Sequence, residues 1–80
     1  MANKEYQGAT KLEAIDVSAN DHDFRERIPR AIWVGTSGDL NVVDQEGDTV
    51  LVPSASGEMN IQPQKILSSS TTASGIVAYY

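Results

Sequence analysis

The apolar residues of this sequence fall in short runs separated by turn residues, and no long helix is predicted. From residue 31 to the end, short apolar runs alternate with stretches rich in glycine, serine, proline and aspartate. Such turn signals recur about every 8–12 residues, a spacing that is typical of small β-sandwiches and barrels. The sequence therefore predicts an all-β fold that is built largely from consecutive antiparallel hairpins.

We expect a small antiparallel sandwich or barrel of about seven short strands. Residues 1–10 are polar and are predicted to form a flexible N-terminal arm, so residues 11–80 would make a single β-domain. Gly47 is suited to the positive φ of a hairpin turn. The strands are expected at residues 11–18, 31–34, 40–43, 48–52, 58–62, 65–69 and 75–80, with turns at 35–39, 44–47 and 53–57.

The core of such a chain needs support. In a chain of 80 residues, a single hydrophobic core rarely contributes more than about 3–5 kcal/mol to the free energy of unfolding. The sequence contains no cysteine, which excludes disulfides and thiolate metal sites, and one histidine cannot build an imidazole cluster. We therefore expect no metal or cofactor, and oligomerisation is the remaining common source of stability.

Several predicted strands are apolar on both faces, which also favours a homo-oligomer. Residues 31–34 are apolar throughout, and residues 50–52 and 76–79 place apolar side chains on both sides of a strand. A sheet with one solvated face should instead alternate apolar and polar residues. Eighty residues without helices can hardly cover both faces, so we expect a neighbouring subunit to cover one of them.

The charge distribution limits the possible partners. The net charge is −5, and after residue 30 there are five acids but a single base, Lys65. Such a surface repels phosphate, so nucleic-acid binding is not expected. No run approaches the roughly 18 apolar residues of a membrane helix, and the first residues lack an apolar leader, so we expect no membrane partner and synthesis in the cytoplasm.

The polar connection at residues 19–30 carries the one concentration of positive charge, on Arg25, Arg27 and Arg30. We expect either a solvated loop or salt bridges to the acidic surface of a neighbouring chain. Phe24 and Ile28 lie four residues apart and are placed to pin this connection to the core.

No set of residues predicts catalysis. The single imidazole, His22, lies between two aspartates in a polar stretch, so an ordinary surface histidine is the expected outcome. Residues 44–48 have the oxygen-rich look of a calcium loop but are too short for an EF-hand, and a hairpin turn explains them. Residues 35–39 lack the lysine and the helix of a phosphate loop. Trp33 is expected in the core. We therefore predict that the protein is not an enzyme.

Candidate residues for an interface with other chains, copies or partners, are aromatic, apolar or basic side chains in the arm, the connection and the strands. They are Tyr6, Arg25, Arg27, Leu51, Val77, Tyr79 and Tyr80.

Three segments, in order and complete to the C-terminus, resemble a family of small phage proteins known as spike base proteins, found in the head spikes of tailed phages and gene transfer agents. The segments are RAIWVGTSGDL at residues 30–40, GDTV at residues 47–50 and KILSSSTTASGIVAY at residues 65–79. The resemblance covers about 50 of the 80 residues. The charged connection at residues 20–30 and the sequence of residues 53–57 depart from the family pattern.

The resemblance implies a virion structural protein, made in the host cytoplasm. It would oligomerise at a capsid vertex as a head spike base or decoration protein, as a pentamer or trimer, with a major capsid protein and a spike or fibre protein as partners. A small carbohydrate- or peptide-binding adhesin or tail module is the alternative interpretation.

Overall fold

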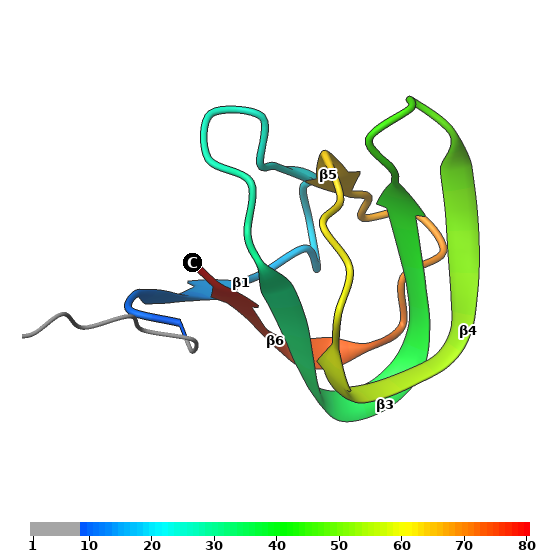
Figure 1. The fold of residues 1–80 in the computed structure, drawn as a ribbon. Coiled ribbons are helices and arrows are strands. Elements are labelled where there is room, and N and C mark those ends of the chain that lie inside the picture. The colour runs from blue at the N-terminus through cyan, green and yellow to red at the C-terminus, as the bar shows by residue number, and fades with distance from the viewer. Residues whose placement is uncertain (1–8) are drawn as a thin grey trace, which may run out of the picture.

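The computed structural model describes residues 9–80, which form strands, turns and loops without a helix (Figure 1). The predicted all-β class is confirmed. The strands are β1 (Leu12–Ile15), β2 (His22–Asp23), β3 (Ala31–Val43), β4 (Thr49–Met59), β5 (Lys65–Ile66) and β6 (Ser74–Tyr79).

All strand pairs are antiparallel, and β3 is the centre of the sheet. One edge of β3 pairs with β4, while the other edge is shared by β6 at its beginning and β5 at its end. β1 pairs with β6, and β2 pairs with β5. Figure 1 shows that the long β3–β4 hairpin curls into an open U, so the sheet forms a half-barrel around its own core.

Two expected turns are wrong, because residues 35–39 and 53–57 are bends inside continuous strands. The pairing of β3 with β4 shifts register between Val34 and Gly38 and again between Gly38 and Leu40. On β4, Ser54 has a φ of 55° and Gly57 a φ of 70°. These bulges let both strands curl together, since a bulge bends a strand without ending it. Two pairs of predicted strands thus merge, and β2 is an additional strand that the sequence did not indicate.

Hydroxyl and amide groups bridge the edge of β3 between β5 and β6. The Asn41 side-chain amide donates to the carbonyl of Ser69 at 2.9 Å, and the Asn41 backbone N–H donates to Thr71 Oγ1 at 3.0 Å. The backbone N–H of Asp39 donates to Thr72 Oγ1 at 2.8 Å. The serine- and threonine-rich segment before β6 therefore satisfies backbone groups that a paired strand would otherwise satisfy.

The core fills the inside of the curled sheet. Alternation along β3 and β6 turns Ile32, Val34, Ile76 and Ala78 inward, where at most 2% of each side chain is exposed. Burying a large aliphatic side chain stabilises a fold by about 1.5–3 kcal/mol. Phe24, 1% exposed, pins the 19–30 connection to this core as expected.

Trp33 is not in the core, and the prediction for this residue is wrong. Its neighbours Ile32 and Val34 point inward, so the two-residue period of a strand turns Trp33 outward. There its side chain is 39% exposed. Ile28 is also exposed, at 37%, and does not join Phe24 in holding the connection.

Candidate interaction surfaces

The 24–30 loop is organised by a close ion pair within the chain. The Arg25 Nη2 lies 2.7 Å from Asp23 Oδ2, and the Arg25 Nε also donates to that carboxylate. These hydrogen bonds lower the pKa of Asp23 to about 2 and raise the pKa of the Arg25 guanidinium. Both side chains remain well exposed, so the pair shapes the loop and still presents polar groups at the surface.

Tyr80 directly follows β6 and is 7% exposed. Its hydroxyl donates to Glu13 Oε1 at 3.1 Å, and the Arg27 guanidinium lies 4.7 Å from the centre of its ring. Burial, followed by the hydrogen bond to Glu13, raises the pKa of the phenol. Tyr80 thus fixes the 24–30 loop against β1 and has little surface left for a partner.

An uncovered apolar face lies on the outside of β1, β6 and β3. Val77 is paired with Ala14 on β1 and with Trp33 on β3, and Tyr79 is paired with Leu12. Leu12 is 61% exposed, whereas Val77 and Tyr79 are half-buried. We call Leu12, Trp33, Val77 and Tyr79 the outer face. Exposed apolar side chains gathered in this way mark surfaces that bind other molecules.

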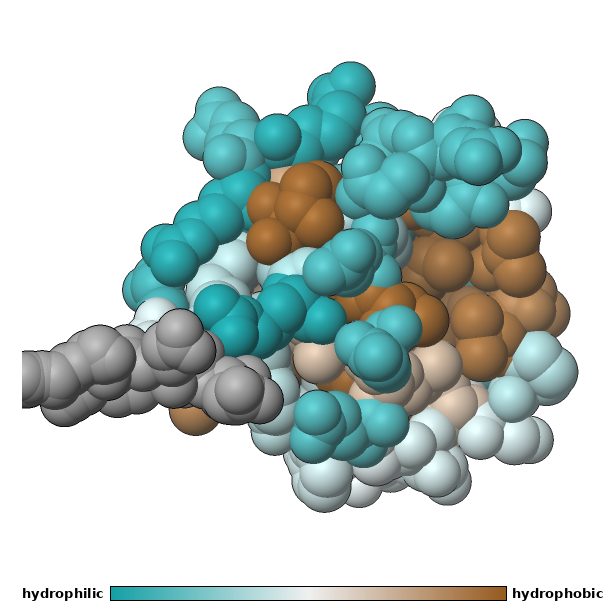
Figure 2. Space-filling model, in the orientation of Figure 1, coloured by the Kyte–Doolittle hydropathy of each residue, from teal (hydrophilic) through white to brown (hydrophobic). Residues whose placement is uncertain are grey.

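A second apolar surface covers the far limb of the U. Figure 2 shows hydrophobic residues gathered over the end of β3 and the first half of β4. Val50 and Leu51 are each 45% exposed. Val50 lines an open groove of about 210 Å³ together with other apolar side chains, among them Val42, Ile61 and Pro63. The two-residue period of the strand turns Leu51 to the other face of β4. We call Val50, Leu51 and this groove the limb patch.

The acidic turn between β3 and β4 is stabilised by the carboxylate of Asp44. Asp44 Oδ1 accepts hydrogen bonds from the backbone N–H groups of Glu46 and Asp48, each at 2.9 Å. Gly47 adopts a φ of 89°. This geometry confirms the predicted role of Gly47 and uses Asp44 within the chain.

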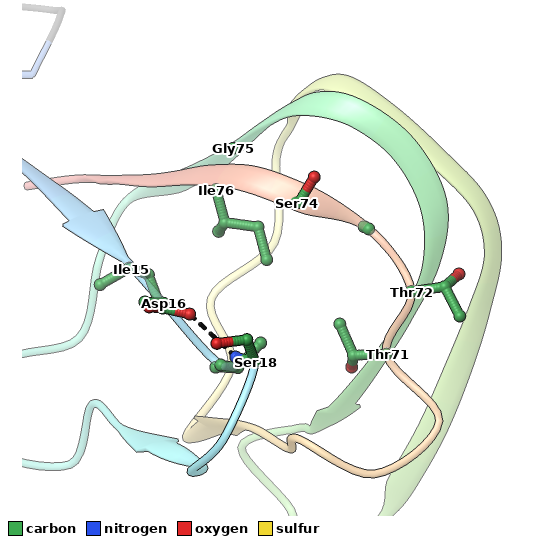
Figure 3. A pocket seen from close by; sticks show the side chains of 10 residues that line it. Ile15, Asp16, Ser18, Thr71, Thr72, Ser74, Gly75 and Ile76 are labelled. Carbon is green, nitrogen blue, oxygen red and sulfur yellow. Dashed lines mark hydrogen bonds between the residues drawn. The ribbon is translucent and has the colours of Figure 1, made fainter.

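A polar hollow of about 480 Å³ lies between the end of β1 and residues 71–76 (Figure 3). Its polar groups already serve the fold. Asp16 Oδ1 accepts the backbone N–H of Ser18 at 2.9 Å, which lowers the pKa of this carboxyl. Thr71 Oγ1 donates to the carbonyl of Leu67. Because these polar groups are already hydrogen-bonded within the chain, we do not assign a ligand to the hollow.

Candidate metal ligands do not converge in the described part of the chain. The His22 ring lies 4.5 Å from that of Phe24, at a tilt of 57°. Within residues 9–80, no three His, Asp or Glu side chains gather closely enough to hold a metal ion. Within the same residues there is no helix of the length and apolarity that a membrane crossing requires.

The structure brings some of the predicted interface residues together and separates others. Val77 and Tyr79 share the outer face, and Arg27 contacts Tyr80. Leu51 lies on the limb patch and Arg25 in the exposed loop, while Tyr6 lies outside the described residues. The sequence analysis missed Leu12 and Val50 as surface residues, although Val50 stands in a strand that is apolar on both faces.

A known particle contains a chain of the same fold. This chain is similar to a chain in the solved capsid of the native GTA (gene transfer agent) particle, computed with C5 symmetry. The match covers 90% of this chain and 83% of that chain, with 31% sequence identity and a TM-score of 0.73. No protein-family model matches this chain, and no curated protein matches it.

A curled all-β domain with uncovered apolar surfaces, matched to a capsid-particle chain at this identity, is a phage-like virion structural protein. The chain belongs to the same family as that protein of the GTA capsid particle. The virion assignment made from sequence is confirmed at this level, and the assignment to head spike bases stays a prediction.

Proposed function

We propose that the protein is a head spike base or capsid decoration protein, which oligomerises at a capsid vertex and anchors a fibre. The observation that carries this proposal is the match to a chain of a capsid with five-fold symmetry. In this role its partners are copies of itself, a major capsid protein and a spike or fibre protein, and a pentamer suits a vertex better than a trimer.

The surface of the chain supports an assembled state. The outer face and the limb patch lie on different parts of the curled sheet, so one partner on one side does not cover both. Val77, Tyr79 and Leu51 are assigned to these two surfaces. Arg25 and Arg27, in the 24–30 loop, supply charged groups for polar contacts with a neighbouring chain.

Light scattering of the purified chain, combined with sedimentation alongside capsids, tests this function. We expect a stable ring, whereas Val77→Asp and Tyr79→Asp dissolve the ring or detach it from capsids, because each places a charge in an apolar contact. Ser37→Asp, at an exposed bend of β3, is the control and assembles normally. Normal assembly of both outer-face variants would show that this face is not the interface.

A small adhesin module remains the second candidate, because Trp33 is 39% exposed and such modules present an aromatic platform to their ligands. Titration with glycans distinguishes the two functions. A saturable change in Trp33 fluorescence favours the adhesin, and an unchanged spectrum favours the structural role.

A further inference from the structure

We propose that the sheet continues from one copy of this chain to the next: the free edge of β1 pairs in parallel with the first half of β4, residues 49–52, of a neighbouring copy. The inference rests on the proposed homo-oligomer and specifies its contact.

Each of these strands has one unpaired edge. Across the described residues 9–80, β1 pairs with β6 and with no other strand, and β4 pairs with β3 alone. An open edge offers a row of backbone donors and acceptors to any strand that approaches it. The two edges bound opposite sides of the sheet, with β6 and β3 between them.

The second half of β4 is protected against such pairing, but the first half is not. Pro53 lacks a backbone N–H, Gly57 stands at a bend with positive φ, and Glu58 adds a charge. Natural monomers use these three devices to keep edges from pairing. The preceding residues, Thr-Val-Leu-Val, contain none of them.

The side chains on these two edges are unusually apolar for a free surface. The large hydrophobic residues that are exposed within the described chain are Leu12, Ile28, Trp33, Val50 and Leu51. Three of these five lie on the two unpaired edges, with 61% of Leu12 and 45% each of Val50 and Leu51 exposed. Pairing the edges covers all three.

Length and charge favour a parallel match. β1 has four residues, and so does the unprotected part of β4. Parallel pairing of Leu12 with Thr49 brings Lys11 beside Asp48 and leaves Asp16 beside uncharged Pro53. Antiparallel pairing of the same residues would bring Asp16 beside Asp48, and like charges directly opposite one another destabilise a sheet.

A contact between two different edges is heterologous, so it propagates head to tail and closes into a ring when the rotation allows. Two copies of the β4 edge pairing with each other would instead stop at a dimer. The proposed edge contact therefore agrees with a vertex ring.

Disulfide trapping tests the pairing, because the chain has no cysteine of its own. The parallel register places Ala14 opposite Leu51. Ala14→Cys and Leu51→Cys chains, purified separately, mixed and oxidised, are expected to form a mixed disulfide dimer. Ala14→Cys mixed with Ser37→Cys is the matched control and stays uncrosslinked. Self-crosslinking of Leu51→Cys at the rate of the mixture would overturn the proposal in favour of a two-fold β4 contact.

Charge reversal gives an independent readout. Asp48→Lys is expected to lower the association constant between copies by about 2- to 5-fold, because it removes an exposed ion pair with Lys11. Adding Lys11→Asp to this variant is expected to restore assembly. Rings that form without the Ala14–Leu51 disulfide would refute the edge pairing while leaving the proposed function intact, whereas a chain that stays monomeric with and without capsids would refute both.

Discussion

Gly38 on β3 faces the backbone of Ala73 so closely that a Cβ on Gly38 would lie 2.6 Å from the Ala73 nitrogen. This contact joins the bend of β3 to the segment that leads into β6. The half-barrel therefore depends on the missing side chain at position 38, at the point where its central strand curls.

Replacing Gly38 by alanine is expected to lower the free energy of unfolding by about 1–3 kcal/mol, because the atoms that meet the new methyl group are mainly backbone and can move little. Urea unfolding followed by Trp33 fluorescence measures the change. Ser37→Ala, at the adjacent exposed position, is the control and should stay within about 0.5 kcal/mol of the parent. Equal stability of the two variants would show that the backbone at residues 72–73 shifts at little energetic cost to make room for the methyl group.

Asn41→Ala is expected to lower the free energy of unfolding by about 1–3 kcal/mol. The substitution leaves the Ser69 carbonyl without its amide donor, next to a buried part of β3. The matched control is Gln45→Ala, which removes an amide that donates to the Gln62 carbonyl at 2.7 Å on the exposed surface. Thermal unfolding of the two variants should give the larger loss for Asn41. A larger loss for Gln45→Ala would contradict the bridging role of Asn41.

The carboxyl of Asp23 is expected to titrate with a pKa of about 2, held low by the hydrogen bonds from Arg25. Its pKa is lower in the folded than in the unfolded chain, so its contribution to stability is complete above the unfolded value of about 3.9 and is lost as the pH falls towards 2. NMR titration of the carboxyl carbon measures the midpoint. In Arg25→Gln the midpoint should move up towards 3.9; an unchanged midpoint would assign the shift to another cause.

Assembly is expected to shift the fluorescence of Trp33 to shorter wavelength. The side chain is 39% exposed in the single chain and lies on the outer face, so a partner that covers this face removes water from the ring. Emission spectra at rising protein concentration, read with the solution mass, test this. If the Trp33 emission of the ring equals that of the dilute chain, the interface between copies does not include the outer face.

The fold class was predictable because strand and turn signals are local. Gly47 takes its turn conformation from the residues around it, and the inward positions of β6 follow from alternation. The bends at residues 35–39 and 53–57 were not predictable in this way. Glycine and proline mark a turn and a bulge with the same local chemistry, and only the pairing of β3 with β4 over both bends distinguishes a curled strand from two hairpin strands.

The interaction surfaces were predictable in type but not in place. Apolar residues on both faces of the strands indicated that a partner is needed, and Val77, Tyr79 and Leu51 do lie on partly exposed apolar surfaces. Tyr80 was a candidate interface residue because aromatic side chains are enriched at interfaces, yet its ring packs beneath Arg27 and its hydroxyl reaches Glu13. That contact joins residues far apart in the sequence, so no local pattern reveals it.

The sequence by itself determined an all-β chain that lacks disulfides and has more apolar strand surface than it can bury, because composition and two-residue periodicity are written locally. The tertiary structure alone decided which apolar residues stay outside. The curl of β3 and β4 encloses Ile32 and Val34 and leaves Trp33, Val50 and Leu51 exposed, since a curled sheet of this size has one inside. Among residues 9–80 it also left β1 and the first half of β4 as open edges, which depends on strand order and not on the residues of either strand.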